Sequence, residues 1–274
     1  LMSAGKINPD TFFSENYITD GMKALYEGVM RRFEGQSDDG IFRLKQTLGG
    51  GKTHNMIALG LLAQHPDLRN KVMGSAYKTS FNKPVKVIAF SGYETPQYGI
   101  WGFMSESLGK KDFFKDYYEP LTAPGQTAWK ELMRDESLLI LLDELPVYLE
   151  GAKARQIGNS DLATQTALAL TNLMVAIGSE ELKNVCLVMS DLTANWQAGM
   201  ELVQDVLRNL NAQTQRAARD FTPVQPNSDE IYQILRKRLF ENDADPTKVK
   251  EIAKAYGEAL KEAKLVGMTS DSPE

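Results

Sequence analysis

The chain has 274 residues, 42% of them hydrophobic and 24% charged, which is enough to bury a substantial core. Its formal net charge of −5 argues against a broad nucleic-acid-binding surface but does not exclude a local basic patch. Cys186 is the only cysteine, which excludes an internal disulfide framework and favours a reducing, cytoplasmic compartment. We expect no membrane association, because residues 1–16 carry no signal-peptide pattern and the apolar stretch 138–142 cannot span a bilayer.

Apolar runs and helical patterns alternate along the chain. Four short runs and a weaker fifth indicate strands buried on both faces of a sheet: 41–45, 85–90, 138–142, 185–189 and 221–224. Helical patterns cover 17–33, 53–64, 161–177, 195–218 and 248–264. This alternation predicts an α/β three-layer sandwich around a five-stranded, mostly parallel sheet. Pro223 and Pro226 break the pattern, and Ser228 is a candidate N-cap. We therefore predict a core domain over 1–225 and a small helical segment over 226–274.

The segment 46–53 reads Gln-Thr-Leu-Gly-Gly-Gly-Lys-Thr and lies between the first predicted strand and the helix 53–64. This is the context of a P-loop, in which glycines let backbone N–H groups face phosphate oxygens and the helix N-terminus adds a positive dipole. Lys52 would reach the β- and γ-phosphates, and the Thr53 hydroxyl would bind Mg²⁺. We therefore predict a P-loop NTPase fold that binds ATP and Mg²⁺. The expected nucleotide-binding residues are Leu48, Gly49, Gly50, Gly51, Lys52, Thr53 and His54.

One position departs from the usual pattern, because Gln46 stands where the first glycine of the loop is expected. The alternative interpretation of the segment is a glycine-rich strand-to-helix turn without a ligand. His54 follows the loop on a buried helix, where a packed or hydrogen-bonded role is favoured over a catalytic one.

The run 138–142 is followed directly by Asp143 and Glu144. Ligands of open α/β sheets bind at the carboxyl ends of the strands, so both carboxylates are candidates for the site. Asp143 would hold Mg²⁺ through water or through the Thr53 hydroxyl. Glu144 would orient or polarise the attacking water. Taken alone, the pair could equally be an acidic cap on a strand.

Two serines follow other predicted strands. Ser190 would lie beside the Asp143 strand and could touch the γ-phosphate or the water, or could satisfy its own backbone as a turn residue. Ser91 ends its strand in the same way and could hold Glu144 in an inactive pose, but a turn role is favoured.

Arg216 and Arg219 precede the fifth predicted strand. Arginines near phosphate chemistry can stabilise the charge of the transition state, which makes both candidate catalytic residues. A solvated helix face explains them equally well.

The chain resembles known ATPases in several blocks. The pair Asp143-Glu144 and the polar end of 185–190 resemble the AAA+ branch of P-loop ATPases, and 221–235 resembles the passage into the lid of the Orc/Cdc6-like group. A closer resemblance is to a family of large prokaryotic ATPases of unassigned function. It is carried by the blocks 12–19, 49–54 (Gly-Gly-Gly-Lys-Thr-His), 101–102, 139–144 and 238–240.

The resemblance implies an AAA+-type module that hydrolyses ATP and drives or gates a partner, in DNA-modification or anti-phage loci. It also implies that the chain is an N-terminal fragment with a partial lid over 226–274. In AAA+ ATPases, arginines at the place of Arg216 and Arg219 serve the neighbouring subunit, so self-association or a partner protein is expected.

Two other functions remain open, an ATP-dependent switch with little turnover and a DNA translocase. Glu144 favours hydrolysis over a pure switch. The acidic composition disfavours an autonomous motor, so DNA would be engaged only through other parts or partners. A GTPase is disfavoured, because no Asn-Lys-x-Asp motif is present.

Overall fold

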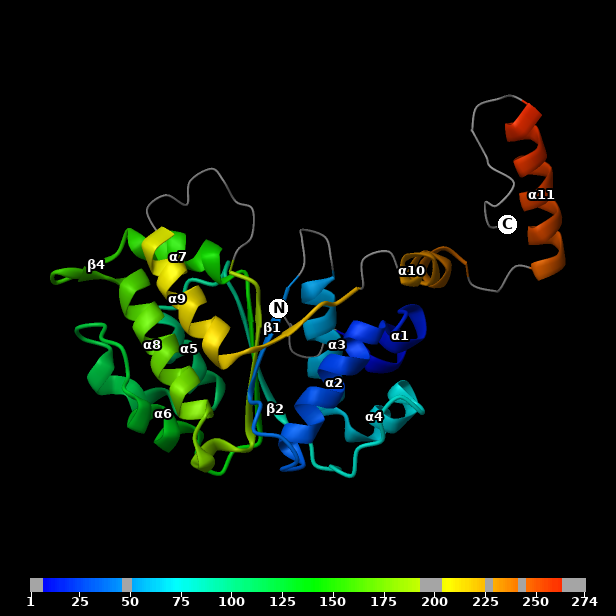
Figure 1. Cartoon of the computed structure of the whole chain (residues 1–274). Helices are drawn as coiled ribbons and strands as arrows, with labels where there is room; N and C mark the ends of the chain where they lie inside the picture. The colour runs from blue at the N-terminus through cyan, green and yellow to red at the C-terminus, as the bar shows by residue number, and fades with distance from the viewer. Residues whose placement is uncertain (1–6, 46–50, 193–203, 225–228, 241–244, 263–274) are drawn as a thin grey trace.

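A five-stranded sheet forms the centre of the protein, and every neighbouring pair of its strands runs parallel (Figure 1). The computed structural model describes residues 7–45, 51–192, 204–224, 229–240 and 245–262. The strands lie in the order β2 (Lys86–Ser91), β3 (Leu138–Asp143), β6 (Val185–Ser190), β1 (Ile41–Leu44) and β7 (Arg219–Phe221).

Helices cover both faces of this sheet, which gives the α/β layering that the sequence predicts (Figure 1). One face carries α1 (Pro9–Glu15), α2 (Asp20–Phe33), α3 (Lys52–Gln64) and α4 (Pro66–Met73). The other face carries α5 (Gly99–Ser107), α6 (Gln126–Met133), α7 (Leu145–Lys153), α8 (Leu162–Ile177) and α9 (Gln204–Ala217). The connections include two 3₁₀ helices, η1 (Lys111–Tyr117) and η2 (Glu180–Leu182), and a small hairpin, β4 (Gln156–Ile157) with β5 (Ser160–Asp161). None of the helices in the described ranges is long and apolar enough to cross a bilayer.

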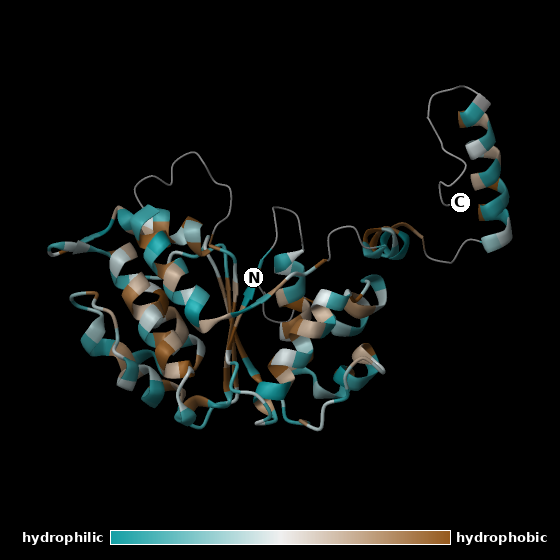
Figure 2. Ribbon diagram, viewed as in Figure 1, coloured by the Kyte–Doolittle hydropathy of each residue, from teal (hydrophilic) through white to brown (hydrophobic). Residues whose placement is uncertain are grey.

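Two hydrophobic cores flank the sheet, one on each face. In β3, Leu138, Ile140 and Leu142 pack with α5–α9, whereas Leu139 and Leu141 pack with α2 and α3. Successive side chains of a strand point to opposite faces, so a strand covered on both sides must be apolar at every position. Figure 2 shows the result as hydrophobic strands between two helical layers whose outer surfaces are hydrophilic.

The first four strands lie within one or two residues of the predicted runs, but the fifth is displaced. Strand β7 is Arg219–Phe221 rather than 221–224. Only Phe221 of its three residues is buried, because β7 is an edge strand. An edge strand of this kind has no continuous apolar run, so the sequence pattern predicts a strand that overlaps β7 only at Phe221.

The chain leaves the sheet across the N-terminus of α2. The Thr19 hydroxyl donates to the Pro223 carbonyl over 2.7 Å, and the Asp20 N–H donates to the Glu230 carboxylate over 2.6 Å. Helix α10 (Glu230–Leu239) begins there, and α11 (Pro246–Glu262) stands apart from the sheet and its covering helices (Figure 1). The candidate cap Ser228 and the first part of the predicted helix, residues 195–203, lie outside the described residues. The boundary between 1–225 and 226–274 stays a prediction.

A buried arginine links the edge strand β7 to its neighbour β1. Arg43 of β1 is 1% exposed, and its guanidinium donates to Asp220 of β7 over 2.8 Å and to Asn211 of α9 over 2.8 Å. The exposed ammonium of Lys45 pairs with the same Asp220 carboxylate over 2.7 Å. Burial raises the pKa of Asp220, but the hydrogen bonds from Arg43 and Lys45 outweigh it and hold the pKa below its ordinary value.

We predict that Asp220→Ala lowers the free energy of unfolding by about 1–3 kcal/mol, because the Nε and Nη2 donors of the buried Arg43 lose the acceptor that Asp220 provides. Chemical denaturation at pH 7 measures this loss. A carboxyl whose pKa is depressed in the folded state stabilises above its ordinary pKa and loses that contribution as pH falls through the folded value. The difference between wild type and variant should therefore shrink below about pH 4.

Lys45→Ala is the matched control, since it removes the exposed partner of the same carboxylate and should cost less than about 1 kcal/mol. Equal losses for Asp220→Ala and Lys45→Ala would contradict the importance of the buried pairing.

Candidate functional site

Polar side chains gather at the carboxyl edge of the sheet. The strand register pairs Ser91 with Asp143 and Leu44 with Ser190, so the ends of β2, β3, β6 and β1 line up. The sequence predicted that the strand ending at Ser190 lies beside the Asp143 strand, and β6 does pair with β3. The helices that follow these strands begin at the same edge, so their N-terminal dipoles point there as well.

Thr53 and Asp143 meet directly at this edge. The Thr53 hydroxyl, in the first turn of α3, donates to Asp143 Oδ2 over 2.5 Å. Asp143 is 2% exposed, whereas Thr53 is exposed. The two residues are 90 positions apart in the chain. Strand β6 lies between β1, which precedes Thr53, and β3, which ends at Asp143. The fold therefore brings together both residues that the sequence proposed as metal ligands.

Helix α3 begins at this edge without a side-chain cap in the described part of the chain. Gly51 occupies the N-cap position with φ 79°, a left-handed conformation that favours glycine. Its carbonyl accepts from the backbone N–H and from the side-chain amide of Asn55, each over 2.9 Å. Helices α2 and α8 are capped by Thr19 and Asp161, respectively. An N-terminus with no acidic residue in its first turn and no side-chain cap is suited to an anion.

The predicted phosphate-binding segment also includes the residues directly before Gly51. Gln46, Leu48, Gly49 and Gly50 of the predicted phosphate-binding segment lie outside the described residues. The effect of Gln46 at the first glycine position therefore stays open.

Glu144 stands at the turn from β3 into α7. Its backbone is left-handed, with φ 54° and ψ 34°, which costs a residue with a side chain roughly 1–2 kcal/mol. The Glu144 N–H is shared between Asp143 Oδ1 at 3.0 Å and the Ser190 hydroxyl at 3.1 Å. Strain of this kind persists only where neighbouring groups fix the backbone, and it concentrates at functional sites.

The charges around Glu144 act in opposite directions. Burial raises the pKa of its carboxyl, the neighbouring Asp143 carboxylate raises it further, and the Lys52 ammonium lowers it. Lys52 opens α3, so the cation comes from the β1 side of the edge and the carboxylates from β3. Lys52 and Glu144 are both half-buried, which keeps these charges partly shielded from water.

Ser190 ends β6 beside Asp143, and its predicted contact with the γ-phosphate or the water stays a prediction. It is 3% exposed, and its hydroxyl accepts the Glu144 N–H. Sequence reasoning missed Gly92, which follows Ser91 at the end of β2. A Cβ on Gly92 would lie 1.8 Å from the Glu144 carbonyl oxygen. The only sequence signal for this close approach is the glycine itself.

His54 packs within the protein, in keeping with the packed role expected for it. Its ring stacks on Phe12 of α1 with 4.9 Å between the centroids. Burial lowers the pKa of the imidazole, and the positive charge of Arg238 on α10 lowers it further. Both effects favour the neutral form of the ring, and its stacking contact joins α3 to α1.

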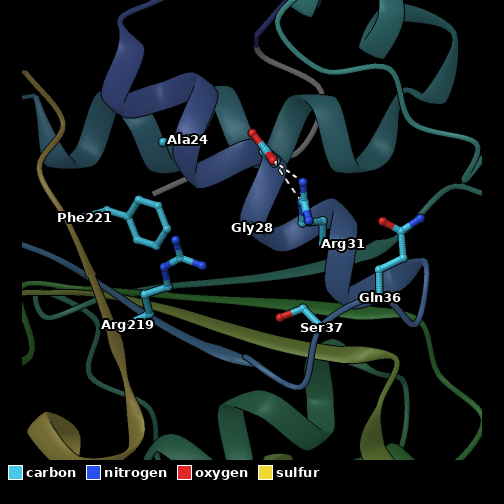
Figure 3. Close-up of a pocket in the computed structure, with 8 residues that line it drawn as sticks. Ala24, Gly28, Arg31, Gln36, Ser37, Arg219 and Phe221 are labelled. Carbon is cyan, nitrogen blue, oxygen red and sulfur yellow. Dashed lines mark hydrogen bonds and ion pairs between the residues drawn. The ribbon is translucent and has the colours of Figure 1, made fainter.

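Arg216 and Arg219 are not brought to this edge. Strands β1 and β6 separate β7 from β3, and Arg219 pairs with Asp39, which precedes β1 at the opposite end of the sheet. Arg216 is exposed near the end of α9. The guanidinium of Arg219 lies over the ring of Phe221 (Figure 3). Both residues line a hollow of about 380 Å³, together with residues of α2 such as Ala24 and Arg31.

The fold and this edge define an α/β protein with a parallel five-stranded sheet and a polar site at the carboxyl ends of its strands. The chain belongs to the DUF499 family, a group of large prokaryotic proteins of unassigned function: the model of the DUF499 N-terminal domain matches it in two segments, residues 6–76 and 62–221. No curated protein matches the chain. The first segment contains Thr53, and the second contains Asp143, Glu144 and Ser190. Helices α10 and α11 lie outside the matched residues.

Proposed function

We propose that this chain is a P-loop ATPase module that binds Mg-ATP at the carboxyl edge of the sheet and hydrolyses it to drive or gate a partner. The contact between the Thr53 hydroxyl and the Asp143 carboxylate carries the proposal. In P-loop NTPases a Ser or Thr at the start of the helix and an Asp at the end of a strand hold Mg²⁺ together.

The donor chemistry fits magnesium. Mg²⁺ prefers hard oxygen ligands and is held in phosphate-transfer sites by one or two side chains together with substrate phosphates. Thr53 and Asp143 supply two adjacent side-chain oxygens, and the exposed position of Thr53 leaves room for a phosphate ligand. Bound Mg²⁺ would neutralise the charge that develops on the transferred phosphoryl group.

The remaining roles are assigned to the chain's own residues. The segment 46–51 and the N-terminus of α3 bind the phosphates through backbone N–H groups and the helix dipole. Lys52 is the side-chain cation at this helix end, and it contacts the β- and γ-phosphates. Glu144 orients the attacking water and accepts its proton as the water oxygen bonds to the γ-phosphorus and the bond to the β–γ bridging oxygen breaks, which releases ADP.

The strand order gives further support. Strand β6 is inserted between β1, which leads into the glycine-rich segment, and β3, which ends at Asp143. This arrangement leaves a strand end between the two ligand-bearing elements, and the AAA+ resemblance implies a polar residue there. Ser190 occupies that place.

We predict that Lys52→Ala abolishes stabilisation by Mg-ATP, because it removes the side-chain cation assigned to the phosphates. Thermal unfolding with and without Mg-ATP measures this, and wild type should gain about 2.7 kcal/mol when ATP is at 100 times its Kd. Lys183→Ala changes an exposed lysine that pairs with Glu180 and is the control expected to respond as wild type does. Stabilisation that survives in Lys52→Ala would remove the phosphate site from this edge.

We predict that Glu144→Gln keeps ATP binding and slows phosphate release by roughly 10²–10⁴-fold, because the amide cannot accept the proton of the attacking water. Steady-state phosphate release and the thermal assay are measured on the same samples. Glu150→Gln removes an exposed carboxylate on the same helix and should leave the rate unchanged. A wild type that binds Mg-ATP but releases phosphate no faster than Glu144→Gln would favour the switch with little turnover.

We also predict that activity per chain rises with protein concentration. Arg216 and Arg219 cannot reach their own chain's site, so they would act on that of a neighbouring copy, where an arginine is worth about 10³–10⁵ in rate. Arg216→Ala or Arg219→Ala should remove the rise and leave ATP-induced stabilisation intact. Arg208→Ala, which changes an exposed arginine earlier on α9, should retain it. Specific activity that is flat across concentration, or wild-type behaviour of both variants, would mean that the two arginines only solvate the surface.

A further inference from the structure

The backbone of Glu144 is fixed from both sides. On its amino side, the N–H is held by Asp143 Oδ1 and by the Ser190 hydroxyl. On its carboxyl side, the carbonyl accepts the Val147 N–H over 3.0 Å as α7 begins. Both peptide groups that flank the Glu144 side chain are therefore anchored, which fixes the direction of its Cα–Cβ bond.

The residue after β2, Gly92, packs against the turn that contains Glu144. The Gly92 N–H donates to the Asp143 carbonyl over 2.9 Å, so the chain after β2 runs along the turn that contains Glu144. A Cβ at Gly92 would lie 1.8 Å from the Glu144 carbonyl oxygen and 2.6 Å from its carbon. No side chain fits there unless the Glu144 peptide moves.

We propose that Ser190 and Gly92 are positioning residues, which hold Glu144 in its left-handed conformation and thereby aim its carboxylate at the attacking water. Ser190 acts on the reaction through the Glu144 backbone and not by contact with the nucleotide. This inference rests on the proposed ATPase function, and for Ser190 it favours a backbone-positioning role over contact with the γ-phosphate or the water.

The burial of Ser190 supports this assignment. Ser190 is 3% exposed, whereas Thr53 at the same edge is exposed. The hydrogen bond that is observed for the Ser190 hydroxyl is the one it accepts from the Glu144 N–H. Misplacement of a reacting group by about 1 Å is enough to cost roughly 10²-fold in rate.

Kinetics of Ser190→Ala test the role in the reaction. We expect kcat to fall by roughly 10–100-fold, with KM for ATP and ATP-induced stabilisation within about twofold of wild type. Ser190→Thr keeps the hydroxyl and should recover most of kcat. Ser105→Ala is the matched control, because Ser105 is also a buried, hydrogen-bonded serine but lies on α5, away from the edge.

Gly92→Ala should lower kcat in the same selective way. Gly151→Ala, where nothing lies within 4 Å of the added Cβ, should not. A normal kcat in Gly92→Ala, with the fold intact, would remove Gly92 from the proposal.

A double-mutant cycle with Glu144→Gln separates the two possible roles of Ser190. If Ser190 acts through Glu144, Ser190→Ala should cost little more once residue 144 is Gln. Multiplied rate losses, or weaker ATP binding in Ser190→Ala, would show direct contact with the nucleotide and overturn the proposal.

Amide hydrogen exchange tests the backbone contact without any turnover. The Glu144 amide should exchange faster in Ser190→Ala than in wild type and should be unchanged in Ser105→Ala. Unchanged exchange in Ser190→Ala overturns the positioning role even where the wild type is an active ATPase. A wild-type chain that neither binds nor hydrolyses ATP instead overturns the proposed function, and with it the catalytic part of this inference.

Discussion

The common direction of the five strands is the constraint on which the site depends. Parallel strands bring all their carboxyl ends to one edge, and the helices that follow them bring their N-terminal dipoles to the same place. The central strands are covered on both faces and are therefore almost wholly apolar, as the buried residues of β3 and β6 illustrate. The polar side chains of Thr53, Asp143 and Ser190 come from distant parts of the chain and gather at this edge. Strand β6 lies between β1 and β3, so Ser190 ends the strand between the two elements that carry Thr53 and Asp143.

Much of this fold could be predicted from the sequence, for a physical reason. A strand covered on both faces reads as a continuous apolar run, which located β1, β2, β3 and β6 to within a residue or two. The edge strand β7 buries only Phe221, so its run is absent and the prediction moved to the apolar residues after it. Short helices such as α4 and α6 were missed, because eight residues give too few turns for a clear period.

The sequence likewise predicted some residues of the candidate site and not others. Thr53, Asp143 and Glu144 were identified because their types and spacing carry chemistry by themselves. The hydrogen bond of Ser190 could not be predicted, since it depends on the left-handed backbone of Glu144 and on the register between β3 and β6. Gly92 has the same limitation, because its need for a missing Cβ arises from a residue 52 positions further along the chain. Sequence patterns indicate which side chains reach the edge, whereas the backbone there determines how they are placed relative to one another.

The left-handed backbone of Glu144 can be compared with that of one other residue, Asp135. In the described residues, Asp135 and Glu144 are the two residues other than glycine with positive φ. Asp135 is exposed in a turn, and aspartate adopts the left-handed region comparatively readily. Glu144 lacks that advantage, and it is half-buried beside the Asp143 carboxylate, so both its backbone and its charge work against stability. A position that is unfavourable for the fold in two independent ways, yet is held by Ser190, Gly92 and the start of α7, is more readily explained by what its carboxylate does than by what it contributes to folding.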